Sequence, residues 1–322
     1  VNPSGRTVDT WVNDLTREPS FNNYVSAYYT NIQPSQTADN ANAYFMDYEE
    51  GIYVGYRYYE TAYAEALAGN YDGFDYDSLV TYPFGYGLSY TTFDWEILSD
   101  NVATAAQDGE IVIEVQVTNT GDVAGKDVVQ LYATPPYDPA TGVEKAAKNL
   151  VAYAKTPLIE AGKSETVTLT FSVQDMASYD YRHANADGTT GCYFLEEGEY
   201  ILTLQTDSHN AKASCSPLTY ALGETVYYDL SNPRESEIEA QTGASRNLSE
   251  EAKQSLTVEA AVNRFEYMNE HFRDYDETQG GTAVNFSRAD FAASFPTAPT
   301  GADLIAPQSV IDDFAAYEPD YY

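Results

Sequence analysis

The sequence predicts a mainly β protein with an antiparallel β-sandwich at its centre. A Tyr-rich segment without strict periodicity precedes the sandwich, and a mixed tail of loop and helix follows it. From about residue 91 the apolar residues alternate with polar ones, as they do in half-buried strands. Clusters of turn residues separate the alternating runs. The 43% share of hydrophobic residues is that of a folded chain.

The first 90 residues contain one clear helix candidate. Residues 58–68 are good helix formers, and a Gly-Asn pair after them supplies a stop signal. Asp72, Asp75 and Asp77 then lie in a loop punctuated by glycine. Their spacing loosely suggests a cation site, but the order and the terminal Glu of an EF-hand are missing. We therefore expect a solvated acidic loop.

The central region contains six predicted strands. They cover residues 91–98, 110–117, 128–132, 150–155, 165–173 and 200–206. Strands of this length separated by turns are typical of an antiparallel β-sandwich of the immunoglobulin or fibronectin type III kind. We place this domain at residues 91–212.

The tail, residues 213–322, changes character again. A short strand is predicted at 225–229. A helix is expected from about Ser249 to Phe272, with Asn247 or Ser249 as its N-cap.

The charge balance excludes some partners. Fifty acidic residues against 16 basic ones give a formal net charge of −34. Such a surface repels phosphate backbones and anionic lipids, which argues against nucleic-acid or membrane-surface binding. It is compatible with neutral partners such as sugars, or with solubility alone. The sequence also contains no apolar stretch of the roughly 18 residues that a membrane helix needs.

The cysteines and histidines do not indicate a metal or cofactor site. Cys192 and Cys215 could form a structural disulfide or remain inert thiols, and neither lies in a metal-binding spacing. His183, His209 and His271 are dispersed, without a partner at ligand spacing. We therefore expect no metal and no cofactor.

Two motifs before the sandwich carry a resemblance to a known family. Residues 47–60 are DYEEGIYVGYRYYE, and residues 82–93 are YPFGYGLSYTTF. The pair resembles the end of the α/β sandwich domain of glycoside hydrolase family 3, the family of many β-glucosidases. Residues 116–132 and 148–180 resemble the fibronectin type III-like domain that follows it in many members.

The resemblance implies a three-part organisation. Residues 1–90 would be the C-terminal part of the α/β sandwich domain, and residues 91–212 the fibronectin type III-like domain. Residues 213–322 would be an extended and helical connector. The stretch from Phe286 to Thr300 resembles the connector of permuted members, in which the catalytic barrel would begin after Tyr322. The resemblance also implies a bacterial enzyme, without fixing its compartment.

The implied activity is retaining hydrolysis of terminal β-glycosidic bonds, as in a β-glucosidase. This chemistry needs two carboxyl groups roughly 5–5.5 Å apart. In the family the nucleophile is an Asp of the barrel, and the acid/base is usually a Glu upstream of the segment matched by Asn2–Arg6. Neither position is covered, so we predict no catalytic residue here and an inactive chain. Asp100, in a Ser-Asp-Asn setting, is expected to be a turn residue.

Three residues of the first motif are candidates for substrate binding: Glu50, Arg57 and Tyr58. One of Glu49 and Glu50 could face the active-site cleft, with Arg57 and Tyr58 nearby. We favour a structural role for Glu50 and Arg57, because adjacent carboxylates on one segment cannot straddle a glycosidic bond. The expected partners are a β-linked saccharide, the barrel and the rest of the α/β sandwich.

A different class of function remains open at this point. The chain could be a non-catalytic β-sandwich module that binds carbohydrate or another partner. Its binding platform would then be formed by exposed aromatic residues such as Trp95, Tyr132 or Tyr137.

Overall fold

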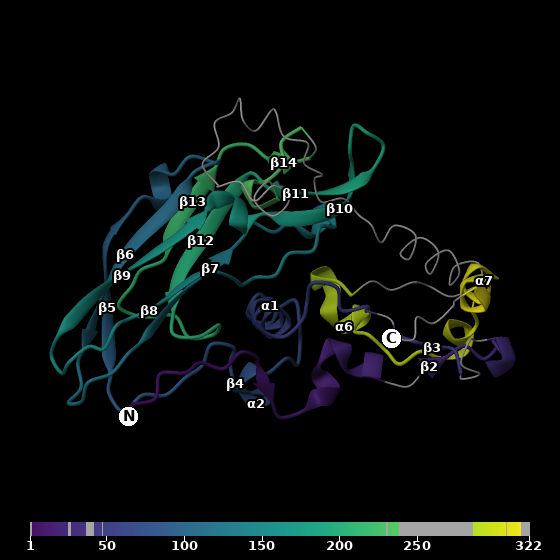
Figure 1. The fold of residues 1–322 in the computed structure, drawn as a ribbon, viewed down its shortest axis with the longest axis horizontal. Helices are drawn as coiled ribbons and strands as arrows, with labels where there is room; N and C mark the ends of the chain where they lie inside the picture. The colour runs from purple at the N-terminus through teal and green to yellow at the C-terminus, as the bar shows by residue number, and fades with distance from the viewer. Residues whose placement is uncertain are drawn as a thin grey trace.

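The protein is described by a computed structural model. The structure describes residues 2–24, 27–36, 42–46, 48–229, 231–237, 286–306 and 308–316. The predicted mainly β fold is confirmed. Figure 1 shows the larger strands gathered on one side, and α1, α2, α6 and α7 with the small strands β1 to β4 on the other.

The sandwich consists of two antiparallel sheets with the strand orders β5-β6-β9 and β13-β12-β7-β8. The first sheet comprises β5 Phe93–Asp100, β6 Glu110–Asn119 and β9 Ser164–Ser172. The second comprises β7 Val128–Thr134, β8 Asn149–Lys155, β12 Gly198–Gln205 and β13 Leu218–Leu222. Ile111, Ile113, Val115 and Val117 of β6 are fully buried between the sheets, while Glu114 is exposed. This alternation is the one that the sequence predicts.

A third sheet has the order β10-β11-β14. Its strands are β10 Ser178–Ala184, β11 Thr190–Leu195 and β14 Val226–Tyr228. The sequence predicts a strand near β14 but none at β10 or β11, because both lack a run of alternating aliphatic residues. β13 lies beyond residue 212 and pairs along its length with β12. The four-stranded sheet therefore includes residues beyond 212, while the three-domain division remains a prediction.

The N-terminal region is built around α1 Tyr56–Leu67, which begins two residues before the predicted helix. Gly55 precedes α1 with a φ of +58°, a conformation that glycine adopts without strain. The other elements are β1 Trp11–Val12 with β4 Val80–Tyr82, β2 Ala27–Tyr28 with β3 Tyr44–Phe45, and α2 Tyr76–Leu79. Short 3-10 turns are η1 Leu15–Arg17, η2 Pro19–Tyr24, η3 Pro34–Gln36, η4 Val102–Thr104, η5 Pro139–Thr141, η6 Val173–Met176, η7 Arg288–Asp290 and η8 Gly301–Leu304.

The tail returns to the N-terminal region. α6 Phe291–Ser294 lies beside α1, as Figure 1 shows, and α7 Gln308–Ala316 packs near β2 and β3. Phe286 and Phe291 complete a second core, which we call the aromatic core. Its buried members are Tyr53, Tyr58, Tyr59, Ala62, Tyr71, Phe74, Tyr76, Leu79, Val80, Phe286 and Phe291. The helix expected from Ser249 to Phe272 lies outside the described residues.

Candidate functional site

The three candidate binding residues differ in their surroundings. Arg57 is exposed on α1, whereas Glu50 and Tyr58 are buried, with 6% and 1% of their surface exposed. Tyr58 lies inside the aromatic core, where its hydroxyl is 3.3 Å from that of Tyr71. Burial raises the pKa of Tyr58 above its ordinary value. Substrate binding by these residues remains a prediction.

A buried carboxylate that the sequence did not single out lies two residues further along α1. Glu60 accepts a hydrogen bond of 2.6 Å from the hydroxyl of Tyr76 and one of 3.1 Å from Ser208. Its other oxygen is 3.1 Å from Nδ1 of His209, whose ring stacks on Tyr76 with the centroids 3.8 Å apart. Because Ser208 and His209 follow β12, this cluster connects the N-terminal region to the sandwich.

Arg288 forms a second connection. Its Nε donates to Oε1 of Glu65 on α1 at 2.6 Å, and its Nη1 donates to the carbonyl of Lys145 at 2.9 Å. The guanidinium also lies over the ring of Tyr137, 4.0 Å from its centroid. One arginine of the tail therefore contacts both the helix and the loop between β7 and β8.

Glu144, in the same loop between β7 and β8, also binds the tail. It accepts hydrogen bonds from the hydroxyls of Tyr53 at 2.5 Å and Ser287 at 2.6 Å, and from the backbone N–H of Arg288 at 2.9 Å. A carboxylate that accepts several such bonds is held in one position. Glu60, Glu65 and Glu144 are therefore held by contacts to other segments of the chain. This arrangement favours a structural role for the three carboxylates over a role in acid–base chemistry.

The acidic residues after α1 are solvated, as expected, but Asp77 lies in the short helix α2 rather than in a loop. Asp72, Asp75 and Asp77 are all exposed, and the side chain of Asp75 caps α2. Within the described ranges, no group of three or more His, Cys, Asp or Glu side chains is placed to hold a metal ion. Asp100 ends β5 and accepts a hydrogen bond of 3.0 Å from the N–H of Val102, which is a turn role.

Both cysteines are buried free thiols. Burial raises the pKa of the Cys192 thiol to about 11, and it also raises that of Cys215. The reactive thiolate is therefore disfavoured, which fits the inert alternative rather than the disulfide.

The predicted aromatic platform is wrong for two of its three members. Trp95 and Tyr132 are 2% and 0% exposed. Trp95 points into the core between the sheets, whereas Tyr132 points away from that core and packs against Tyr56 of α1. The indole N–H of Trp95 donates to Asp127 at 2.8 Å, and the hydroxyl of Tyr132 donates to Gln130 at 2.8 Å. The third member, Tyr137, is partly covered by Arg288.

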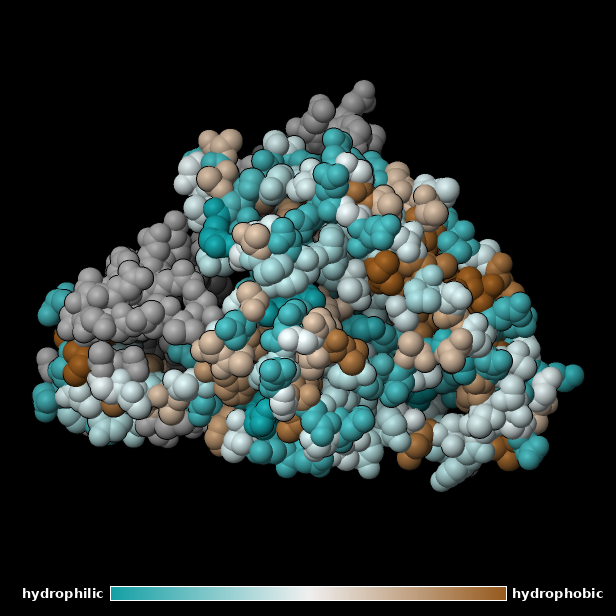
Figure 2. Space-filling model, turned by 180° about the vertical axis from the view of Figure 1, so that it is seen from behind, coloured by the Kyte–Doolittle hydropathy of each residue, from teal (hydrophilic) through white to brown (hydrophobic). Residues whose placement is uncertain are grey.

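Exposed apolar side chains concentrate in the N-terminal region. Of the 19 large hydrophobic residues that are exposed in the described part of the chain, 14 lie in the first 90 residues. They are Val8, Trp11, Leu15, Phe21, Tyr28, Tyr44, Met46, Tyr48, Ile52, Val54, Leu67, Tyr82, Leu88 and Tyr90. We call this set the exposed apolar residues. Figure 2 shows that hydrophobic side chains also form a band over the sandwich when the molecule is viewed from behind.

Known proteins match this chain over most of its length. Residues 127–208 match the fibronectin type III-like domain family. The chain is 36% identical over 237 residues to β-glucosidase A of Butyrivibrio fibrisolvens, covering 70% of this chain and 24% of that protein. It is 32% identical to β-glucosidase B of Emericella nidulans, covering 63% of this chain and 20% of that protein. The chain thus spans about a quarter or less of the length of these relatives.

Solved structures give the same result. A β-glucosidase from Paenibacillus barengoltzii matches 70% of this chain with a TM-score of 0.54 and 33% identity, and the match covers 21% of that protein. β-Glucosidase 3B from Thermotoga neapolitana, in complex with α-D-glucose, matches 71% of this chain with a TM-score of 0.51 and 30% identity. This match covers 26% of that protein.

The strand pattern and the match at residues 127–208 define the central domain as a fibronectin type III-like β-sandwich. The relatives and the similar structures are β-glucosidases, which confirms the resemblance to glycoside hydrolase family 3. About 70% of this chain corresponds to the non-barrel portion of these enzymes that contains the fibronectin type III-like domain. The relatives include bacterial and fungal proteins. None of the described helices is long and apolar enough to cross a membrane.

Proposed function

We propose that this chain is the non-barrel portion of a retaining β-glucosidase-like enzyme of family 3, which hydrolyses terminal β-glycosidic bonds. In this proposal the chain supports the catalytic barrel and shapes one side of the cleft. Its partners are the barrel, the rest of the α/β sandwich and a β-linked saccharide. A bacterial source is part of the proposal, and the relative from Butyrivibrio fibrisolvens supports it.

The exposed apolar residues carry this proposal. A concentration of large apolar side chains on a surface usually marks an interaction site. Trp11 is 62% exposed and its strand partner Tyr82 is 42% exposed, so even the small sheet β1–β4 presents aromatic surface to solvent. Because the matched relatives are several times longer than the chain, the rest of the enzyme is the natural cover for these side chains.

The contacts that join the N-terminal region, the tail and the sandwich support the same role. Ion pairs and buried hydrogen bonds from Glu60, Glu65 and Glu144 hold the N-terminal region, the tail and the sandwich together. A surface presented to a catalytic barrel has to be rigid if it is to hold a cleft in one shape.

Activity assays test the proposal directly. The 322-residue chain and the complete enzyme encoded by its reading frame are compared on an aryl β-glucoside. We expect turnover, with retention of anomeric configuration by NMR, only from the complete enzyme. Comparable turnover by this chain alone would overturn the proposal.

A docking assay tests the interface. The chain and the remaining part of the enzyme are produced separately, mixed, and assayed for binding and restored activity. Trp11→Glu should weaken this association at least about tenfold, because it places a charge in an apolar contact. The matched control is Leu158→Glu, which changes an exposed leucine of the sandwich region. Equal behaviour of the two variants would contradict the assignment of the exposed apolar residues to this interface.

A further inference from the structure

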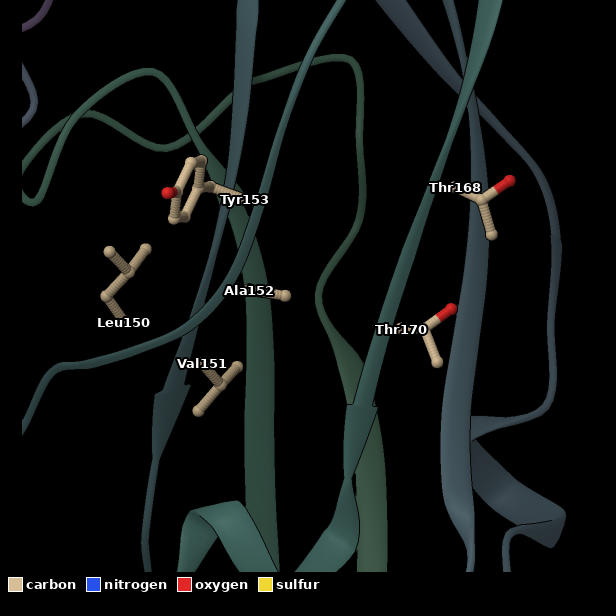
Figure 3. A pocket seen from close by; sticks show the side chains of 6 residues that line it. All are labelled: Leu150, Val151, Ala152, Tyr153, Thr168 and Thr170. Atoms are coloured by element: carbon tan, nitrogen blue, oxygen red, sulfur yellow. The ribbon is translucent and has the colours of Figure 1, made fainter. Parts of the chain in front are cut away.

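The groove between the edge strands β8 and β9 does not gather side chains around one ligand, although its volume is about 460 Å³. Figure 3 shows Leu150 and Tyr153 of β8 on one side, and Thr168 and Thr170 of β9 on the other. The strand registers put the first two on the outer face of the four-stranded sheet. They put the two threonines on the opposite outer face of the three-stranded sheet. A single small molecule between the strands would therefore not contact all four.

A smaller groove lies between α1 and the segment that leads into α2, with a volume of about 260 Å³. It is lined by Tyr63, Ala66 and Leu67 of α1 and by residues 74–77 on the other side. The three residues of α1 are three and four positions apart, so they share one face of the helix. The ring of Tyr63 packs with its edge against Tyr76, with 5.4 Å between the centroids. The two sides of this groove therefore belong to one packed unit.

The inner wall of the groove between α1 and α2 is apolar. Phe74 and Tyr76 belong to the aromatic core and are only 9% and 5% exposed. Leu67 is 72% exposed and is one of the exposed apolar residues that we assign to the interface with the rest of the enzyme. The groove is therefore continuous with that proposed interface.

The rim of the same groove is acidic. Asp75 and Asp77 are both exposed. One oxygen of Asp75 accepts a hydrogen bond of 3.4 Å from the backbone N–H of Ser78. Asp77 has no hydrogen-bond or ion-pair partner among the described residues. Two carboxylates beside an apolar wall, on a chain with a net charge of −34, favour a cation that also carries apolar surface.

The chemistry of the wall selects between kinds of cation. Calcium and magnesium need about six oxygen ligands, whereas two carboxylates and an apolar wall line this groove. An arginine side chain matches it better, because its planar guanidinium pairs with carboxylates and stacks on aromatic rings. Its methylene stem also packs on apolar surface.

We propose that this groove receives an arginine side chain from the rest of the enzyme. The inference rests on the proposed function, which supplies the partner. In the complex, the guanidinium lies between the ring of Tyr63 and the carboxylate of Asp77, and the stem packs on Leu67.

NMR titration of the 322-residue chain with N-acetyl-arginine methylamide tests the groove by itself. We expect saturable binding, and binding at least about tenfold weaker for the citrulline analogue, which keeps the shape but lacks the charge. Asp77→Asn and Tyr63→Leu should each weaken binding about threefold or more, because they remove a carboxylate charge and an aromatic ring. The matched control is Asp72→Asn, at an exposed carboxylate outside the groove. Asp75 is left unchanged because it also caps α2.

Association with the separately produced remaining part of the enzyme tests the occupant. Asp77→Lys should weaken it about tenfold, because like charges then face each other. Asp72→Lys changes the net charge equally and should weaken it less than about twofold. Equal effects of these two variants would overturn the proposal.

Equal binding of the arginine and citrulline compounds would also overturn it. That comparison uses the wild-type chain, so it holds even for a variant that thermal unfolding shows to be misfolded. Trp11→Glu in the same association assay reports on the proposed interface as a whole. Loss of association with Trp11→Glu but not with Asp77→Lys would therefore reject the arginine site and leave the proposed function intact.

Discussion

Arg288 and Glu65 form an ion pair with 2.6 Å between Nε and Oε1, although 223 positions separate them in the sequence. Only 10% and 9% of the two side chains are exposed. The pair attaches the tail to α1, and the adjacent Phe286 and Phe291 complete the aromatic core. The tail is therefore a structural part of the N-terminal region rather than a free connector at this point.

Breaking this ion pair should destabilise the chain strongly. Arg288→Met leaves the buried carboxylate of Glu65 without its cation, which costs about 3 kcal/mol or more. Urea denaturation of the 322-residue chain measures the change in free energy of unfolding. Arg57→Met, at an exposed arginine of the same helix, is the control and should change it by less than about 0.5 kcal/mol. Equal effects of the two variants would show that the pair contributes little.

Glu18 should make stability depend on pH. Burial raises its pKa above the ordinary range, while a hydrogen bond from Tyr59 opposes this shift. Because the folded-state pKa is raised, the stability that Glu18 contributes is fully present below its unfolded pKa of about 4.3 and is lost as the pH rises. The stability of Glu18→Gln relative to the wild type should therefore increase as the pH rises above about 4.

The control for this pH dependence is Asp14→Asn, because the pKa of Asp14 is lowered by hydrogen bonds from Thr16. The stability that Asp14 contributes should therefore depend on pH in the opposite direction, and it should be lost as the pH falls. Parallel stability profiles of Glu18→Gln and the wild type as the pH rises would contradict the burial of a protonatable Glu18.

Both thiols should be unreactive in the folded chain. Cys192 and Cys215 are the two cysteines of the sequence, both are buried, and the pKa of Cys192 is raised to about 11. A thiol reagent at pH 8 should label neither rapidly, and both only after unfolding in guanidinium. Rapid labelling of the native protein, or an intact mass that shows a disulfide without reductant, would contradict this expectation.

Asp127 should stabilise the start of the second sheet. One oxygen accepts from Arg6 at 2.7 Å, and the other accepts from the indole of Trp95 at 2.8 Å. Asp127→Ala leaves a buried indole N–H unpaired, and we expect a loss of about 1–3 kcal/mol. Trp95 fluorescence should change in the same variant. Asp122→Ala, at an exposed residue of a nearby turn, should leave both stability and fluorescence unchanged.

Local periodicity was sufficient to predict much of the sandwich. The alternation at residues 110–117 and 165–173 agrees with β6 and β9, because the side-chain period of a strand is a property of neighbouring residues. The same holds for α1, whose residues favour a helix and end at a glycine. β10 and β11 were missed because a Tyr-rich and a Gly-containing strand show no aliphatic alternation.

Motifs carried the resemblance to the family, but they did not indicate the contacts that join the N-terminal region, the tail and the sandwich. Glu60 contacts His209, 149 residues away, and Glu144 contacts Ser287, 143 residues away. No local sequence pattern predicts which distant side chains contact each other, because such contacts depend on how the whole chain packs. For the same reason, the sequence did not show that Trp95 is buried between the two sheets and Tyr132 against Tyr56 of α1.

The order of residues was therefore enough to predict six of the seven strands of the two sandwich sheets and the resemblance to the family, since both depend on short stretches of chain. Three-dimensional packing decided which carboxylates are paired with a cation, which aromatic side chains are accessible to solvent, and how the tail packs against α1. These properties arise from contacts between segments that folding brings together, and from the water that those contacts exclude.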